Sequence, residues 1–190
     1  MIDKLNETAH KILDAAQIMV MTDGLNGFSY KDLQREVGIK TSSIHYHFPA
    51  KQDLIAALML RHNAQVELNL EQIARKNVSS VDKIREFGNS FVEIAEQDKF
   101  CLCGMLASDL LSVSPAVSNH VNDFFRTAEK WITEQLQSGI DSKELKQPIN
   151  PAEAASCFIA SMEGGVLIAR AKKDVKYMKL VLNQAMSVFQ

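Results

Sequence analysis

The sequence has few of the features that hold small secreted proteins together or anchor a chain in a membrane. It contains only three cysteines, Cys101, Cys103 and Cys157, which are too few and too unevenly spaced for a disulfide framework. No charged-then-apolar segment of the signal-peptide kind opens the chain, and no stretch approaches the ~20 apolar residues that a bilayer-spanning helix needs. We therefore expect a cytoplasmic protein that does not interact with a membrane.

An excess of positive charge is also missing. Lysine and arginine number 21 against 23 aspartates and glutamates, for a net charge of -2, so the chain as a whole has no attraction for polyanions. Any nucleic-acid surface must therefore be a local patch. With 190 residues, 46% of them hydrophobic, the chain can bury a proper core without disulfides.

Convincing runs of alternating strand residues are absent as well, and the dominant period is helical. Ser29 with Asp32 has the form of a capping box, Thr41 can cap the helix after the Gly38 turn, and Gly139 is placed to end a long helix. Apolar spacing, start signals and stop signals together predict helices over about 5–22, 30–37, 41–47, 51–76, 80–94, 106–111, 115–139, 152–170 and 174–189. The predicted fold class is all-α.

The segment around Gly38 predicts a helix, a glycine-containing turn and a second short helix, the arrangement that places a recognition helix in the major groove of DNA. Ile44 and Phe48 would form the inner face of the second helix. Its outer face would offer donors to phosphates and base edges from Lys40, Thr41, Ser42, Ser43, His45, Tyr46 and His47. Lys51, at the start of the next helix, can meet a phosphate. By spacing alone, a solvated polar helix without a nucleic-acid partner explains the pattern equally well.

The residue types favour DNA binding over a merely solvated helix. The segment GFSYKDLQREVGIKTSSIHYHFPAKQDL, residues 27–54, resembles the DNA-binding segment of the TetR family of transcriptional repressors. Positions that match the family pattern are Gly27, Phe28, Leu33, Val37, Gly38, Ile39, Ile44, His47, Phe48, Lys51 and Leu54. The sequence departs from that pattern at Lys40, where serine is usual, at His45, where tyrosine is usual, and at Ala50, where serine or asparagine is usual.

The resemblance implies a helix-turn-helix DNA-binding domain over residues 1–50 and a helical effector-binding and dimerisation domain over residues 51–190. Carried over position by position, contacts to double-stranded operator DNA would fall on Ser29, Tyr30, Lys31, Lys40, Thr41, Ser42, Ser43, His45, Tyr46, His47 and Lys51. The apolar positions of the segment would instead be core, namely Phe28, Leu33, Val37, Ile44 and Phe48.

The resemblance also implies a homodimer, in which the last two helices of each subunit form a four-helix bundle. Small and apolar residues of the helix over 152–170 would lie at this interface, namely Ala154, Phe158, Ser161, Met162 and Gly165. Two-fold symmetry would hold the two recognition helices roughly 34–36 Å apart, which predicts a palindromic operator. The same small residues could equally serve a helix contact inside one subunit.

A small-molecule pocket in the larger domain is a further implication of the resemblance. Aromatic, thiol and aliphatic side chains suited to such a pocket are Phe87, Phe91, Cys103, Leu106, Phe124, Phe125, Trp131 and Met162. Each of them could equally be an ordinary core residue. Few charged anchors are evident in this part of the sequence, so we expect an apolar or amphipathic effector.

Taken together, these patterns predict a homodimeric repressor that a small-molecule effector releases from a palindromic operator. An alternative trigger is an oxidant or electrophile acting on Cys101 or Cys103, because Lys99 and a helix start lie nearby and could activate a thiol. A buried structural role for both cysteines also explains the pattern. No nucleophile elbow, phosphate-binding glycine loop or metal-spaced cluster is evident, so we expect neither an enzyme nor a metal or other cofactor.

Overall fold

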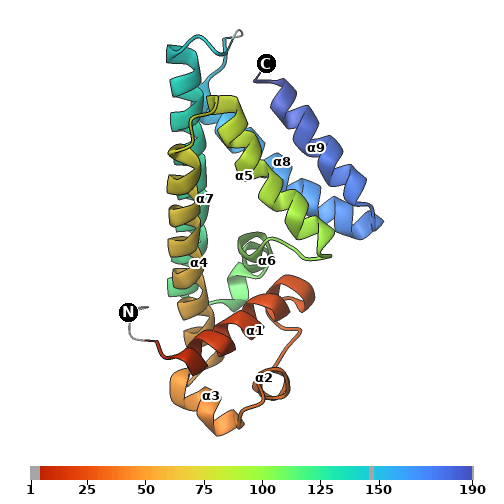
Figure 1. Ribbon diagram of the computed structural model, residues 1–190. Coiled ribbons are helices and arrows are strands. Elements are labelled where there is room, and N and C mark those ends of the chain that lie inside the picture. Colours follow the sequence, from red (N-terminus) through yellow and green to blue (C-terminus); the bar gives the residue numbers. More distant parts are fainter. Residues whose placement is uncertain (1–4, 146–147, 190) are drawn as a thin grey trace. The chain divides into compact units, whose positions relative to one another are not determined.

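Helices make up all the regular secondary structure of the computed structural model, which describes residues 5–145 and 148–189 (Figure 1). The all-α prediction is confirmed for these residues. In chain order the helices are α1 (Glu7–Asp23), α2 (Tyr30–Val37), α3 (Thr41–His47), α4 (Lys51–Ala74), α5 (Ser80–Glu96), α6 (Leu102–Ser108), the 3₁₀ turn η2 (Leu110–Ser112), α7 (Pro115–Asp141), α8 (Pro151–Lys172) and α9 (Val175–Ser187).

At the helix starts, polar side chains accept hydrogen bonds from the backbone N–H groups that have no partner within the helix. The capping box predicted for α2 is present, with the backbone N–H of Ser29 donating to Asp32 Oδ2 at 2.8 Å. Ser79 accepts from the backbone N–H of Asp82 at 3.0 Å, and the Asn150 side chain accepts from the first turn of α8. Local sequence therefore determines where these three helices begin.

Two of the predicted helix signals are wrong. Thr41 is the first residue of α3 rather than its cap; the cap position is Lys40, whose side chain makes no capping bond. Gly139 does not end α7, which runs to Asp141. A Cβ at Gly139 would lie 3.2 Å from the Leu145 side chain, so this glycine serves close packing inside the helix rather than termination.

The chain divides into two compact units. Unit 1 consists of residues Met1–Gln65 and Leu102–Asp123, and unit 2 consists of Val66–Cys101 and Phe124–Gln190. These units are defined by which residues pack together. The predicted division at residue 50 separates a DNA-binding function from an effector-binding function, and it stays a prediction. Residues 1–4, 146–147 and 190 of the predicted domains lie outside the described residues.

The core of unit 1 lies where α1, α2 and α3 pack against one another. Phe28, Leu33, Ile44 and Phe48 expose 5, 0, 0 and 3% of their surface, so their predicted place in the core is confirmed. Val37, predicted with them, is only half-buried. The buried Ile44 side chain fixes which face of α3 turns outward.

In unit 2, α5, α8 and α9 pack against one another (Figure 1). Glycines allow the close approach of these helices. A Cβ at Gly88 of α5 would lie 2.5 Å from Leu182 Cδ1, and one at Gly165 of α8 would lie 2.7 Å from Met178 Sδ. Gly165 therefore serves a helix contact within the subunit.

Helix α8 is more apolar than the sequence analysis allowed. With 22 residues and a mean hydropathy of 1.3 over its best window, it is long and apolar enough to cross a membrane by length and composition. The expectation that no segment reaches this length is therefore wrong. Its packing against α5 and α9 is that of a bundle helix, although only 39% of the window is buried.

Candidate functional site

Helix α3 has one buried face and one polar outer face. Ile44 is fully buried beneath it, while Ser42, His45 and Tyr46 are exposed. The Tyr46 ring is 82% exposed, an unusual state for a large aromatic side chain that has both apolar area and a hydroxyl group to offer. The remaining predicted contacts of this segment comprise the exposed Lys40 and the half-buried Thr41, Ser43 and His47. This outer face has the form of a recognition surface.

The turn that sets the angle of α3 depends on Gly38 and Gln34. Gly38 has φ 74° and ψ 27°, the left-handed conformation that glycine adopts most easily. Gln34 Oε1 then accepts hydrogen bonds from the Thr41 hydroxyl and, at 3.2 Å, from the Thr41 backbone N–H. The amide of Gln34 thereby replaces the cap that Lys40 lacks. The sequence analysis missed this role because the two partners come from different helices.

Tyr30, predicted to contact DNA, uses its hydroxyl within the fold. The hydroxyl donates to the Phe48 carbonyl oxygen at 2.8 Å, and the ring lies 4.7 Å from the His45 ring between centroids. Burial, with a smaller contribution from Asp53, raises the pKa of Tyr30 to about 12. The Tyr30 hydroxyl thus holds the end of α3 in place. A DNA contact by Tyr30 stays a prediction.

Lys51 also points into the fold. Its Nζ donates to the carbonyl oxygen of Leu25 at 2.6 Å and to that of Phe28, and it lies 3.9 Å from the centroid of the Phe28 ring. Burial lowers the pKa of Lys51. Two of its three N–H donors join the start of α4 to the loop before α2. The phosphate contact by Lys51 stays a prediction.

The start of α2 provides a second polar area beside α3. Ser29, Lys31 and Thr41, all predicted contacts, line a cleft of about 570 Å³ together with Asp32, Gln34 and Arg35. The hydroxyl of Ser29 donates to Asp32 Oδ2 at 2.6 Å. Hydrogen bonds from Ser29, and then the one from Arg35, lower the pKa of Asp32 to about 2. Arg35 pairs with Asp32, whereas the Lys31 side chain is exposed and suits a contact with a phosphate backbone.

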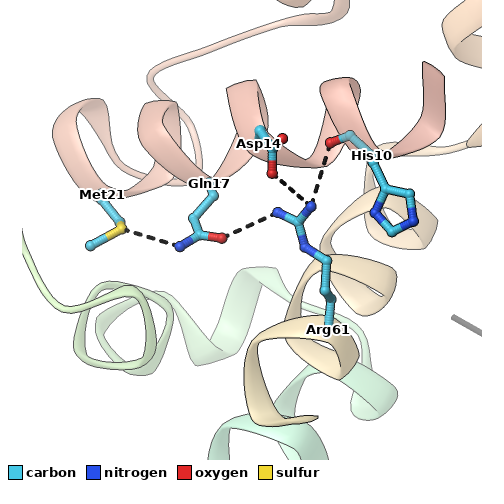
Figure 2. A network of polar contacts seen from close by, with 5 residues as sticks. All are labelled: His10, Asp14, Gln17, Met21 and Arg61. Carbon is cyan, nitrogen blue, oxygen red and sulfur yellow. Dashed lines mark hydrogen bonds and ion pairs between the residues drawn. The ribbon is translucent and has the colours of Figure 1, made fainter. Parts of the chain in front are cut away.

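Helix α4 is tied to α1 through Arg61 (Figure 2). Arg61 Nη1 donates to Asp14 Oδ1 at 2.7 Å and to the His10 carbonyl oxygen at 3.4 Å, and Nη2 donates to Gln17 Oε1 at 3.3 Å. The Gln17 amide continues the network to Met21 Sδ at 4.0 Å. The Arg61 side chain is only 18% exposed. A displacement of this part of α4 would therefore strain or break its hydrogen bonds to α1.

Two amide side chains tie α4 to the chain around α7. Gln52 Nε2 donates to the Ser112 carbonyl oxygen at 3.0 Å, and Gln52 Oε1 accepts from the Ser114 backbone N–H at 2.9 Å. About three helical turns further along α4, Asn63 Nδ2 donates to the His120 carbonyl oxygen at 2.9 Å. Within unit 1, α4 is therefore fixed on several sides by polar contacts that no sequence motif announced.

The predicted pocket residues divide between the two units. In unit 2, Phe87 lies 5.6 Å from Phe91 and 5.9 Å from Trp131 between ring centroids. The other members assigned to unit 2 are the buried Phe124 and Met162 and the half-buried Phe125. Cys103 and Leu106 are fully buried core residues of unit 1. An aromatic cluster on α5 and α7 is thus the part of the predicted set that the structure assembles.

Glu163 of α8 is a charged residue that the sequence analysis overlooked. Burial raises its pKa to about 7, opposed by a hydrogen bond with the Cys101 side chain. Its Oε1 atom is buried without a hydrogen-bond partner in the described part of the chain, as is Trp131 Nε1. The expectation that this region lacks charged anchors is therefore wrong. Helical spacing alone could not separate Glu163 from the solvent-facing acidic residues.

The cysteines do not have the surroundings of reactive thiols. Cys101 and Cys103 expose 4 and 0% of their surface, and the neighbour of Cys101 is the carboxyl group of Glu163 rather than a cation. Lys99, which was expected to activate a thiol, donates instead to Gln97 Oε1 at 2.7 Å. Reactive cysteines are normally accessible and lie beside positive charge, so the structure offers no support for the thiol trigger.

The predicted interface residues of α8 divide into two groups. Phe158, Met162 and Gly165 are buried inside their own subunit, where Phe158 lies beside Gly88 of α5 and Gly165 beside Met178 of α9. Their place in a dimer interface stays a prediction. Ala154 and Ser161 are half-buried and line a groove of about 100 Å³. The exposed large apolar side chains of α8 and the C-terminal segment are Leu167 at 57%, Ile168 at 39%, Leu180 at 64% and Val188 at 54%.

Comparison with known proteins agrees with this architecture. The family described as "Bacterial regulatory proteins, tetR family" matches residues 12–58, and "Tetracyclin repressor-like, C-terminal domain" matches residues 80–185. A crystal structure of a TetR transcriptional regulator from Legionella pneumophila is 30% identical, with a TM-score of 0.88, covering 98% of this chain and 100% of that one.

Curated relatives extend over most of the chain as well. The HTH-type transcriptional regulator YvkB of Bacillus subtilis is 25% identical over 84% of this chain and 82% of its own length. The nucleoid occlusion factor SlmA of a Marinomonas species is 24% identical over 95% of this chain and 92% of its own length. On the strength of the two family matches and the Legionella structure, this chain belongs to the TetR family of transcriptional regulators.

Proposed function

We propose that this regulator is a homodimeric repressor that binds a palindromic operator and leaves it when a small-molecule effector binds. The observation that supports DNA binding best is the outer face of α3, where exposed polar side chains stand above the fully buried Ile44. A protein that acts on chromosomal operators would work in the cytoplasm. Effector release requires that the effector bind the released conformation more tightly, by several kcal/mol for a complete switch.

The proposed DNA contacts are those predicted side chains that remain available at the surface. They are Ser29, Lys31, Lys40, Thr41, Ser42, Ser43, His45, Tyr46 and His47. Tyr46 and Ser42 are exposed on α3 and are proposed to face the groove, while Lys31 and Lys40 are proposed to contact phosphates. Tyr30 and Lys51 hold the segment in shape from within.

The proposed dimer contact uses the exposed apolar surface of α8 and α9 rather than their buried faces. Leu167 and Ile168 of α8, with Leu180 of α9, expose large apolar areas, and such surfaces commonly mark sites of protein association. Gly164 has no neighbour within 4 Å of a Cβ placed on it, which would let a partner helix approach closely. This assignment also explains why the apolar α8 is largely unburied within one subunit.

The proposed route from effector to DNA is α4. Its first residues are tied to the DNA-binding segment through Lys51 and to the chain before α7 through Gln52. Arg61 ties the middle of the helix to α1. Because α4 continues to Ala74 in unit 2, an effector that displaces its far end would shift these contacts and with them the position of α3.

Selection of bound fragments from a random duplex pool, followed by mapping of the selected sequence in the genome, tests the proposal. A repressor dimer should select a palindrome that overlaps a promoter, and light scattering should give a mass near twice 21.2 kDa. A monomer that selects no duplex at low salt would contradict DNA binding by this surface. Because one relative has the name of a nucleoid occlusion factor, selected sites away from promoters would argue for a DNA-binding role other than repression.

A further inference from the structure

Two buried polar atoms of unit 2 have no hydrogen-bond partner in the described part of the chain. One is an acceptor, Oε1 of Glu163 on α8, and the other is a donor, Nε1 of Trp131 on α7. Trp131 is only 8% exposed. Leaving a buried polar group unpaired destabilises the folded state, and folded proteins pair nearly all such groups with protein, water or ligand. Two unpaired atoms in the same unit therefore suggest a place for a bound molecule.

No positive side chain among the described residues acts on the carboxyl group of Glu163. The causes acting on its pKa are burial, which raises it, and the hydrogen bond with Cys101, which lowers it; no positive side chain is among them. Arg170 lies two helical turns further along α8, but its guanidinium forms an ion pair with Asp98 at 3.6 Å and lies 4.3 Å from the centroid of the Phe100 ring. A buried carboxylate is stable only when it is paired or protonated. Among the described residues, no cationic side chain is paired with Glu163, so its charge is left for a partner from outside the chain.

Three aromatic rings of the same unit lie close to one another. Phe87 and Phe91 of α5 lie edge to face, and Trp131 lies 5.9 Å from Phe87 between ring centroids. Helix α5 packs against α8, the helix that bears Glu163. The faces of aromatic rings attract organic cations. The same rings also accommodate an apolar body, as small-molecule sites generally do.

We infer that unit 2 binds a lipophilic organic cation, an amine or quaternary ammonium with an apolar body, whose charge pairs with Glu163 and whose apolar part lies against Phe87, Phe91 and Trp131. Trp131 Nε1 donates to a polar substituent of the same ligand or to a water that accompanies it. This inference deepens the proposed effector response and rests on it for its regulatory meaning. It narrows the sequence-based expectation of an apolar or amphipathic effector to an amphipathic molecule with a positive charge.

The chain offers a direct probe, because Trp131 is its single tryptophan. Binding of (3-phenylpropyl)trimethylammonium is measured by the change in Trp131 fluorescence at pH 8, beside 3-phenylpropanol, which has the same aromatic tail and no charge. The expected result is at least tenfold tighter binding of the cation. The variant Glu163→Gln should lose that preference, because it keeps the size of the side chain and removes its charge. The alcohol should bind the variant and the original protein alike.

Glu153→Gln is the matched control, since Glu153 is an exposed acidic residue on the same helix. It should leave cation binding unchanged and so exclude a general effect of negative charge. Equal binding of the cation and the alcohol by the original protein would overturn the inference without reference to any variant. Unchanged cation binding by Glu163→Gln, with circular dichroism that shows a folded protein, would overturn the assignment to Glu163.

Operator binding, measured separately on the selected duplex, distinguishes this inference from the proposed function. If the cation binds unit 2 but leaves operator affinity unchanged, the ligand class stands and effector release fails. If the operator is bound and no cation is recognised, the repressor proposal stands and the ligand class fails.

Discussion

The DNA-binding segment and the interior of unit 2 differ in whether their partly or fully buried polar groups have hydrogen-bond partners. In the segment, the polar ends of Tyr30, Lys51 and Gln34 are paired with backbone atoms that fix α3. In unit 2, Glu163 and Trp131 are buried with polar atoms that have no partner in the described chain. The first arrangement suits a rigid surface that must fit DNA without adjustment, and the second suits a site that is completed by something it binds.

The largest effect should come from replacing a buried residue of α8. Phe158→Ala should lower the free energy of unfolding by about 3–5 kcal/mol, because the ring is buried against α5 and α9 and its loss leaves a cavity. Urea titration measures the loss. The matched change Leu167→Ala, at an exposed position, should leave folding nearly unaffected and raise the dimer dissociation constant. If Phe158→Ala changed only dimerisation, Phe158 would be an interface residue after all.

The next comparison separates a structural lysine from a DNA contact. Lys51→Met should destabilise the protein by about 1–3 kcal/mol, since the Leu25 and Phe28 carbonyl oxygens lose their donor. Lys31→Met, at an exposed position, should leave stability unchanged and flatten the salt dependence of operator binding by about 0.9 in log K against log salt. If Lys51→Met instead left stability unchanged and flattened the salt dependence of operator binding, Lys51 would be a phosphate contact.

The buried carboxyl of unit 2 should make stability depend on pH. The pKa of Glu163 is about 7 in the folded chain against an ordinary 4.5, so the folded state holds an extra proton between these values. Its contribution to stability is therefore lost as pH rises from about 4.5 to 7. Glu163→Gln should be more stable than the original protein by on the order of 1–3 kcal/mol at pH 8, with little difference at pH 4.5. Thermal unfolding at several pH values measures this, and a gain that does not vary with pH would show that burial does not shift the carboxyl.

The smallest effect concerns the glycine on the free face of α8. Gly164→Ala should raise the stability of the folded subunit by about 0.5–1 kcal/mol, because alanine favours the helix and the added Cβ meets nothing within 4 Å. Chemical denaturation at low protein concentration measures this gain. Weaker dimerisation of the same variant would support a close helix approach at this position, whereas a loss of subunit stability would show that the site is packed within the chain.

Sequence reasoning reached the fold class and the identity of α3 because those depend on local rules. Capping residues, the Gly38 turn and the spacing of Ile44 and Phe48 act over a few positions. It could not find the hydrogen bonds of Tyr30 and Lys51 within the fold, because their partners, Phe48 and the loop before α2, are distant in sequence. A lysine that fits a motif gives no indication whether its ammonium turns outward or inward.

The same limit explains what was missed in the second half of the chain. Phe158 and Gly165 share one helical face with residues suited to a dimer contact, and only the positions of α5 and α9 show that this face is already covered. Glu163 is one of many acidic residues on amphipathic helices, and nothing in its neighbours along the sequence marks it as buried. Tertiary packing, rather than local pattern, decided these cases.

The most direct test of the central claim is a hydroxyl-radical footprint of the selected operator with the original protein and with Tyr46→Ala. If the outer face of α3 reads DNA in a two-fold dimer, the footprint should show two symmetric patches centred roughly 34–36 Å apart. Tyr46→Ala, changing a side chain that is 82% exposed, should fold normally and lose discrimination among operator variants. A single unsymmetric patch, or identical operator preferences in both proteins, would contradict the account.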